Sequence, residues 1–226
     1  MFQAWGSLYD SGERSDISFI VGPTETLISA HKLVLSTHSK HFAALFYSGM
    51  EESSQSVIRL PNQDAEVFET LVRFMYTGQL RLHKDNVQEL IKMADYYALE
   101  TVKEGVGDWI GKCLVDMTNV VKFIIFANTH NVQTLSKYCH RFMLGNAKDI
   151  FFSKEFQESI PNEILERMVA SDDLNLTELE LFESLVQLGK VRTGEGGTGM
   201  VSEYSESSDD EHVMGRRRRQ CSASLK

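Results

Sequence analysis

The chain has 226 residues, of which 42% are hydrophobic, 24% charged and 10% aromatic, as is usual for a soluble globular protein. It carries 23 Lys and Arg against 32 Asp and Glu, and this net charge of -9 argues against a general binder of nucleic acid or anionic membranes. Three widely spaced cysteines form no disulfide framework, and the first ten residues do not resemble a secretory signal, so we expect a reduced, intracellular protein.

The front part of the chain has the patterns of three short strands. Apolar residues alternate with others from 17 to 21, as in a half-buried strand. After a Gly-Pro turn, residues 26–30 form a second strand with two apolar residues on one face, and residues 57–60 form a third that ends before Pro61.

Helical spacing follows these strands. Asp64 is a candidate N-cap for a helix with five apolar residues facing inward, closed by Thr77-Gly78. A second stripe of apolar residues, three or four positions apart, begins at Val87 and ends at Tyr97.

From Met117 onward the pattern is only helical. Asn119 is expected to cap a segment that is apolar on nearly all sides and therefore buried, and Asn131 to cap the next helix. Pro161 suits a helix first turn, and a capping box at 177–180 predicts a last helix.

The composition changes at Thr193, where a tail rich in Gly, Ser and segregated charge begins. It has too little apolar surface to offset the entropy of ordering, so we predict that residues 193–226 are disordered. Ser207 and Ser208 are candidate sites for an acidophilic kinase, and Arg216, Arg217, Arg218 and Arg219 are a candidate nuclear import signal. The alternative for the serines is an unmodified, solubilising tail, and the alternative for the arginines is a contact for acidic groups.

The sequence nominates no catalytic, cofactor or metal site. The nucleotide-binding, serine-hydrolase and zinc-protease motifs are missing, and the Gly-rich segment near 194–199 follows no strand. His38 and His41 could share a helix face and hold a metal, but no thiolate or carboxylate stands at the spacing a tetrahedral site needs. We therefore expect no enzyme, no cofactor and no metal.

Five segments in a fixed order resemble a BTB (POZ) domain over about residues 5–113. They are DISF (16–19), AHKLVLS (30–36), FAALFYSGMEES (42–53), FETLVRFMYTG (68–78) and ADYYAL (94–99). The helical segment 119–188 resembles the front part of a BACK domain, although Leu188 stands where that family usually has Trp.

The resemblance implies an α+β fold: short strands packed against a helical cluster, followed by an all-helical extension. The domains are then a BTB/POZ domain at 1–115, a partial BACK-like region at 116–192 and the tail at 193–226. The chain resembles a kelch-like adaptor without kelch repeats.

The resemblance also suggests a surface for cullin-3. Family members that bind cullin-3 often carry a hydrophobic-x-Glu motif after a helix that ends in Phe-x-x-Gly, and Met50 and Glu52 match this motif behind Phe46. Tyr97 matches an aromatic residue that the family uses toward cullin. The alternative is an incidental exposed Met beside an acidic loop.

A second set of residues corresponds to the family's dimer interface. Asp16 and Lys32 occupy the positions of a charged pair near the homodimer groove, and Trp5 and Leu8 belong to a segment that packs across the partner. The alternatives are solvated or capping charges and a helix that folds back on its own domain.

These observations favour a non-catalytic, homodimeric adaptor that links an unknown client to a cullin-3 RING ubiquitin ligase. The alternative is a BTB scaffold or regulator that heterodimerises with other BTB proteins and never binds cullin. We expect no nucleic-acid or membrane partner and a cytoplasmic location, with the nucleus as a second compartment.

Overall fold

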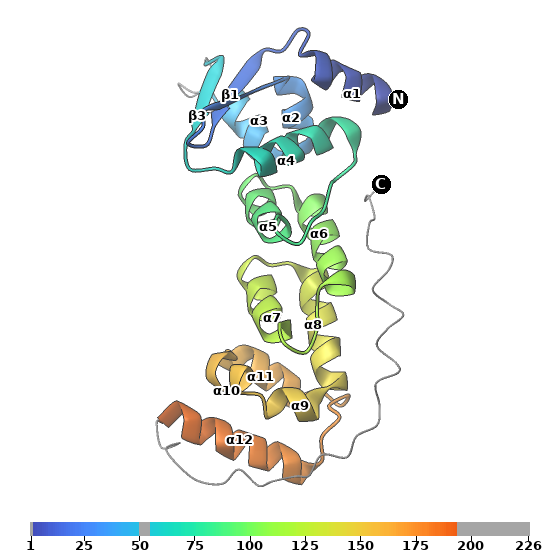
Figure 1. The fold of residues 1–226 in the computed structure, drawn as a ribbon, viewed down its shortest axis with the longest axis vertical. Helices are drawn as coiled ribbons and strands as arrows, with labels where there is room; N and C mark the ends of the chain where they lie inside the picture. Colours follow the sequence, from blue (N-terminus) through green and yellow to red (C-terminus); the bar gives the residue numbers. More distant parts are fainter. Residues whose placement is uncertain (1, 50–54, 194–226) are drawn as a thin grey trace. The chain divides into compact units, whose positions relative to one another are not determined.

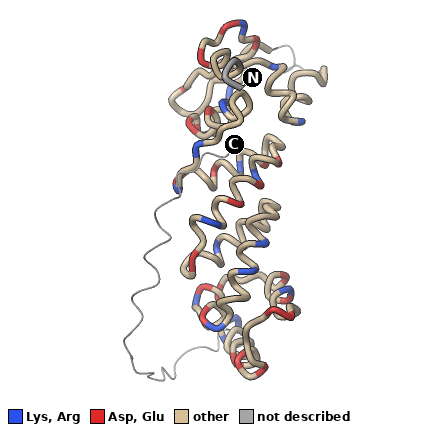
Figure 2. The backbone as a smooth tube through the Cα atoms, turned by 90° about the vertical axis from the view of Figure 1, so that its right-hand side faces the viewer, with Lys and Arg blue, Asp and Glu red and all other residues tan. Residues whose placement is uncertain are grey.

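The computed structural model describes residues 2–49 and 55–193. The chain divides into two compact units: the residues up to Ile110 form the first, and those from Gly111 onward form the second. Acidic and basic residues are interspersed along the helices of both units (Figure 2). In the described ranges, the helices are all too short or too polar to span a bilayer.

The first unit contains a three-stranded sheet with the strand order β2-β1-β3 (Figure 1). β1 (Ile17–Val21) pairs antiparallel with β2 (Thr26–Ala30) and parallel with β3 (Val57–Leu60). The predicted strands are therefore confirmed. Every second residue of β1 is buried, as the alternation of apolar residues predicts.

In the described part of the first unit, this sheet is accompanied by helices. They are α1 (Phe2–Ser11), α2 (Lys32–His38), α3 (Lys40–Tyr47), α4 (Ala65–Thr77), α5 (Val87–Tyr96) and α6 (Glu100–Cys113), the last of which runs into the second unit. The predicted ends of α4 are confirmed, because the Asp64 carboxylate accepts from the Val67 N–H at 3.0 Å and Gly78 is left-handed at φ 67°.

Aromatic rings fill the core between the sheet and the helices. Phe19 of β1 is fully buried and packs edge-on against Phe42 of α3 and Phe68 of α4, with ring centroids 5.9 and 5.1 Å apart. Phe42 in turn stacks on Tyr97 at 4.6 Å. The sheet, α3, α4 and the end of α5 thus share one aromatic cluster.

The backbone N–H groups at the start of α2 donate to side chains from distant parts of the sequence. His31, its N-cap residue, makes no side-chain capping bond, and the first helical N–H, that of Lys32, donates to the Asp16 carboxylate at 2.7 Å. The backbone N–H of His31 donates to the Tyr76 hydroxyl at 2.7 Å, and the ring nitrogen Nε2 of His31 contacts the Glu13 carbonyl at 2.9 Å. Residues before β1 and within α4 therefore fix where α2 starts.

The second unit is helical in its described part. Its helices are α7 (Val120–Thr129), α8 (Gln133–Gly145), α9 (Ala147–Phe151), α10 (Lys154–Ser159), α11 (Asn162–Val169) and α12 (Glu178–Thr193). α7 packs along α8 and also contacts α10. Val120, Phe123, Ile124 and Ala127 of α7 are buried, as predicted for a helix that is apolar on nearly all sides.

Three capping predictions need correction. Asn119 is the N-cap residue of α7, but its side chain turns back to the preceding loop, where it accepts from the Asp116 N–H and donates to the Leu114 carbonyl. Val132 is the N-cap residue of α8, while Asn131 adopts a left-handed φ of 53°, which a short polar side chain tolerates. Pro161 is the N-cap residue of α11 and thus precedes its first turn.

The predicted capping box of α12 is confirmed. The Glu180 carboxylate accepts from the Thr177 N–H at 3.0 Å, the Glu180 N–H donates to the Thr177 hydroxyl at 3.3 Å, and Lys148 pairs with the same carboxylate at 3.0 Å. The Thr177 N–H, the Lys148 ammonium and the Thr177 hydroxyl together lower the pKa of Glu180 from 4.5 to about 2.

We expect Glu180→Gln to remove part of the acid sensitivity of the second unit. Because the pKa is lower in the folded state, the charged carboxylate stabilises the fold above pH 4.5, and this contribution is lost as the pH falls toward 2. The thermal midpoint of the variant should lie below that of the wild type at pH 6, and the difference should shrink steadily as the pH falls from 4.5 toward 2. Glu183→Gln, at an exposed position of the same helix, is the control. A constant difference at every pH would contradict the prediction.

Candidate protein-interaction surface

The two histidines considered as metal ligands lie on different helices, and Cys139 lies in the core. His38 ends α2 and His41 lies in the first turn of α3, and the extended residue Ser39 separates the two helices, so the two histidines do not share a helix face. Cys139 is fully buried, and burial raises the pKa of its thiol to about 12. Among residues 2–49 and 55–193, no three His, Cys, Asp or Glu side chains are grouped as metal ligands.

Two exposed tyrosines end the helices α3 and α5. Tyr47 is 64% exposed and Tyr96 is 60% exposed. His41 of α3 lies beside Tyr96, with ring centroids 4.9 Å apart, and burial lowers the pKa of this imidazole. Tyr96 and His41 lie together, and Tyr47 is a second exposed ring on α3; for brevity we call the three residues the α3–α5 surface. Exposed tyrosines are typical of binding surfaces, because the ring buries area while the hydroxyl keeps a hydrogen bond.

The residues predicted to contact cullin lie beneath this surface or outside the described residues. Phe46 is 3% exposed and Tyr97 is 2% exposed, and both rings stack on Phe42. Met50 and Glu52 lie outside the described residues. That Phe46 and Tyr97 contribute to a cullin interface stays a prediction, and their burial means that they would act by supporting their exposed neighbours.

Hydrogen bonds hold the end of α5 against the start of α3. The Ser39 hydroxyl donates to the Tyr97 carbonyl at 2.5 Å and accepts from the Phe42 N–H at 3.1 Å, so it caps α3 and ties it to the residue after α5. The Tyr97 hydroxyl donates to the Gln63 side chain at 2.8 Å. The backbone that carries Tyr96 is therefore fixed relative to α3.

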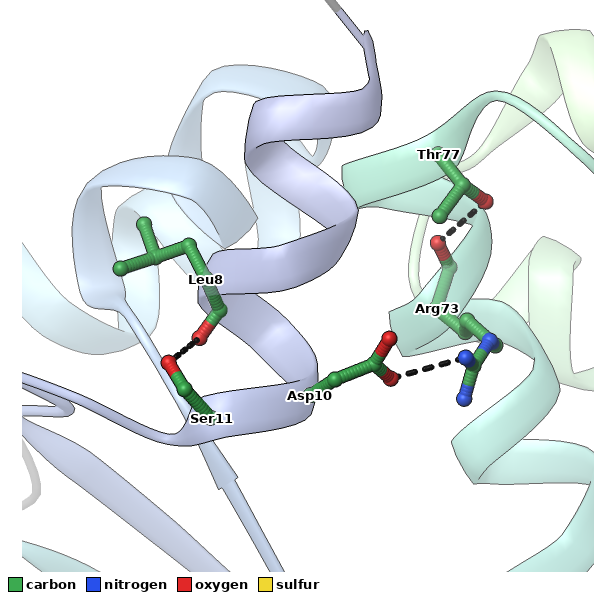
Figure 3. A network of polar contacts seen from close by, with 5 residues as sticks. All are labelled: Leu8, Asp10, Ser11, Arg73 and Thr77. Atoms are coloured by element: carbon green, nitrogen blue, oxygen red, sulfur yellow. Dashed lines mark hydrogen bonds and ion pairs between the residues drawn. The ribbon is translucent and has the colours of Figure 1, made fainter.

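Helix α1 folds back on α4 of its own chain. The ring of Tyr9 packs against Tyr76 at 5.1 Å, and the Arg73 guanidinium lies 5.6 Å from the Tyr9 ring centroid. Figure 3 shows Asp10 of α1 reaching Arg73 of α4, with which it pairs at 2.8 Å. Trp5 remains 41% exposed, while Leu8 is half-buried. The role of Trp5 and Leu8 in a dimer stays a prediction.

The Asp16 carboxylate and Lys32 are brought together through the backbone. Asp16 accepts from the Lys32 N–H, so it caps α2. The Lys32 ammonium lies 5.6 Å from the centroid of the Phe46 ring, in a cation–π contact. Asp16 is exposed and Lys32 is half-buried, so the part that these residues play in a dimer interface stays a prediction.

The remaining predicted sites, Ser207, Ser208 and Arg216 to Arg219, lie outside the described residues. Sequence reasoning named Phe46 and Tyr97 as site residues but not their direct neighbours Tyr47 and Tyr96. The signal was available, because helical spacing places Tyr97 on the inward stripe with Val87, Leu90, Ile91 and Ala94 and leaves Tyr96 outside.

Two family models match the chain. One describes the BTB/POZ domain and matches residues 6–112, and the other describes BACK ("BTB And C-terminal Kelch") and matches residues 120–192. The first covers the strands and the α3–α5 surface, and the second covers α7 to most of α12.

Relatives of the chain include Kelch-like proteins and a BTB/POZ domain-containing protein. The chain is 33% identical to Kelch-like protein 1 of Mus musculus over 76% of its own length, 30% identical to BTB/POZ domain-containing protein 9 of Drosophila melanogaster over 74%, and 32% identical to Kelch-like protein 17 of Mus musculus over 79%. It spans 22%, 23% and 27% of the length of these relatives, respectively.

Proposed function

Because the chain is a BTB/POZ domain protein with a BACK extension, and thus a protein-interaction module, we propose that it is a non-catalytic, homodimeric adaptor that binds cullin-3 and presents a client to the ligase. It uses the α3–α5 surface, together with Met50 and Glu52, to hold cullin-3. Ubiquitin transfer belongs to the other subunits of the ligase. The adaptor acts by proximity, since a dimer raises the effective concentration of whatever it holds.

The exposed aromatic rings of the α3–α5 surface carry this proposal. A domain that buries Phe19 and Phe42 completely still leaves Tyr47 and Tyr96 more than half exposed. Aromatic residues in the centre of an interface commonly supply a large share of its binding free energy. The rings of Tyr47 and Tyr96 lie edge-on to the buried rings of Phe46 and Tyr97, with centroids 6.4 and 5.0 Å apart, and these contacts reduce the ordering entropy lost on binding.

We expect Tyr96→Ala and Tyr47→Ala each to weaken binding to the cullin-3 N-terminal region about tenfold or more, as truncation of an interfacial aromatic anchor does. Isothermal titration calorimetry on the purified protein measures this, with light scattering to give the stoichiometry. Met50→Asp and Glu52→Lys test the adjacent motif. Leu27→Ala is the matched control, because Leu27 is 64% exposed on β2 of the same unit.

Absence of binding by the wild-type protein would refute the cullin proposal. An equal loss of cullin-3 affinity in Leu27→Ala would refute the location of the interface. Unchanged affinity in all four variants at Tyr47, Met50, Glu52 and Tyr96 would do the same.

A second function is a dimerising regulator that pairs with other BTB proteins and does not bind cullin. Exposed apolar residues on the two N-terminal helices favour it: Trp5 of α1 is 41% exposed and Leu33 of α2 is 67% exposed. Cross-linking followed by mass spectrometry separates the two functions, since recovery of BTB partners without cullin supports the regulator.

A further inference from the structure

The last helix of the second unit, α12, has apolar residues on two opposite faces. Its inner face buries Ser184 and Leu188 and packs against α10. On the opposite face, Leu179, Phe182 and Val186 are 66%, 65% and 40% exposed. Their spacing of three and four residues places them on a single stripe, which we call the outer stripe of α12. Because a surface helix normally turns a polar face to water, such a stripe is typical of a helix that pairs with another helix.

The outer stripe has an open space as well as projecting side chains. Gly189 follows Val186 by three residues and so continues the stripe toward the end of the helix. It is exposed, and a methyl group added at its Cα would meet no side chain within 4 Å. The stripe therefore presents a large side chain, Phe182, on one side of Val186 and room for one, at Gly189, on the other side.

Charges beside the outer stripe follow the same order. Glu183 and Lys190 are both exposed, and their separation of seven residues, or two turns, places them on one flank of the stripe. The acidic residue precedes Val186 by about 4.5 Å along the helix axis, and the basic residue follows it by about 6 Å. Arg192, by contrast, donates to the Asn162 side chain of α11 and lies toward the inner face.

A stripe with this order is complementary to a second copy of itself when the two helices run antiparallel. About a twofold axis at Val186, Phe182 of each helix lies opposite Gly189 of the other, to within the rise of one residue, about 1.5 Å. Glu183 of each helix lies opposite Lys190 of the other within the same distance. In a parallel pair, like would face like, phenyl ring against phenyl ring and carboxylate against carboxylate. Shape and charge thus both favour a second copy in the antiparallel direction.

We propose that two copies of the chain associate through the outer stripes of α12, antiparallel and about a twofold axis at Val186. The ring of Phe182 covers the partner's Gly189, and Glu183 pairs with the partner's Lys190. A contact along one helix of 16 residues buries less than the roughly 800 Å² per partner of a stable interface, so the association is weak. It uses the second unit alone and depends neither on cullin binding nor on a BTB dimer.

Disulfide trapping in the full chain tests this, because linked pairs accumulate even when the contact is weak. The background carries Cys113→Ser and Cys221→Ser, which leaves only the buried Cys139. Val186→Cys places a thiol at the axis, where the Cα atoms of the two helices come within about 4–6 Å, as a disulfide requires. Leu179→Cys is the matched control: it lies on the same stripe, but the antiparallel pair holds its two copies about 21 Å apart. We expect Val186→Cys to link about tenfold faster or more under mild oxidation.

Charge reversal tests the direction of the pairing. In the Val186→Cys protein, Glu183→Lys and Lys190→Glu should each slow the linking about threefold or more, because each places like charges opposite one another. Mixing the two variants should restore the rate, since each then faces the opposite charge of the other. The linked dimers should be mixed ones, which mass spectrometry identifies.

Three results would overturn the proposal: no linking of Val186→Cys, equal linking of Val186→Cys and Leu179→Cys, or mixed dimers that form no faster than those of either charge variant alone. Absence of linking would point to a stripe that is covered from within the chain, and equal linking to random collision or a parallel pair. Both added thiols replace exposed side chains, so the thermal midpoints should match that of the background, which excludes unfolding as the cause of a difference.

Discussion

Phe42→Ala is expected to lower the free energy of unfolding by about 3–5 kcal/mol, the usual cost of removing a buried phenyl ring. Phe42 is fully buried and contacts the rings of Phe19, Phe46 and Tyr97, with centroids 5.9, 5.7 and 4.6 Å away. Its removal leaves a cavity lined by three other aromatic rings, each held by a different element. These elements have little freedom to move inward, so the cavity should stay largely open.

Urea unfolding followed by circular dichroism measures this effect. Tyr47→Ala is the matched control: it removes an aromatic ring from the same helix, but at a position that is 64% exposed, and it should change the free energy of unfolding by less than about 0.5 kcal/mol. A loss below about 1 kcal/mol in Phe42→Ala would show that the cluster is not the centre of the core.

Tyr76→Phe should cost about 1–3 kcal/mol although it removes a single oxygen atom, because it leaves polar groups of His31 without a partner. The Glu13 carbonyl can only accept, so the Nε2 of His31 carries the proton in that contact. In the neutral ring, Nδ1 then accepts from the Tyr76 hydroxyl at 2.7 Å, while the same hydroxyl accepts from the His31 N–H. Burial raises the pKa of Tyr76 to about 12, so the phenol keeps the proton that it donates.

The same denaturant measurement tests this second prediction. Tyr96→Phe is its control, because Tyr96 is 60% exposed and removal of its hydroxyl leaves no buried group without a partner. If both variants lose equally little stability, the contacts among Tyr76, His31 and Glu13 do not hold the start of α2.

Local patterns predicted much of the fold. Alternation located the strands at 17–21 and 26–30, Pro61 marked the end of the strand at 57–60, and the Asp64 cap and Gly78 marked both ends of α4. These signals are local: each depends on residues within one or two turns of the position concerned. Asn119 and Asn131 show the limit, since a residue that can cap a helix can equally bond to a loop or take a left-handed turn, and tertiary packing selects among these.

The residues of the cullin interface stay a prediction. Family resemblance pointed to Phe46 and Tyr97, which are buried, whereas Tyr47 and Tyr96 are exposed. The helical stripe of α5 already placed Tyr97 inward, so the two arguments were in conflict at this residue. Contacts such as Ser39 to Tyr97 join residues 58 positions apart and leave no trace in local sequence patterns.

The remote caps of α2 determine how this part of the protein folds and opens. A helix of seven residues is too short to form alone in water, and its first N–H groups are bonded only when the residues before β1 and the end of α4 are in place. The helix, the sheet and α4 should therefore form and open as one cooperative unit, with similar hydrogen-exchange protection in α2 and β1. A partner that displaces α2 would consequently have to overcome the free energy of opening the whole cooperative unit rather than that of one short helix.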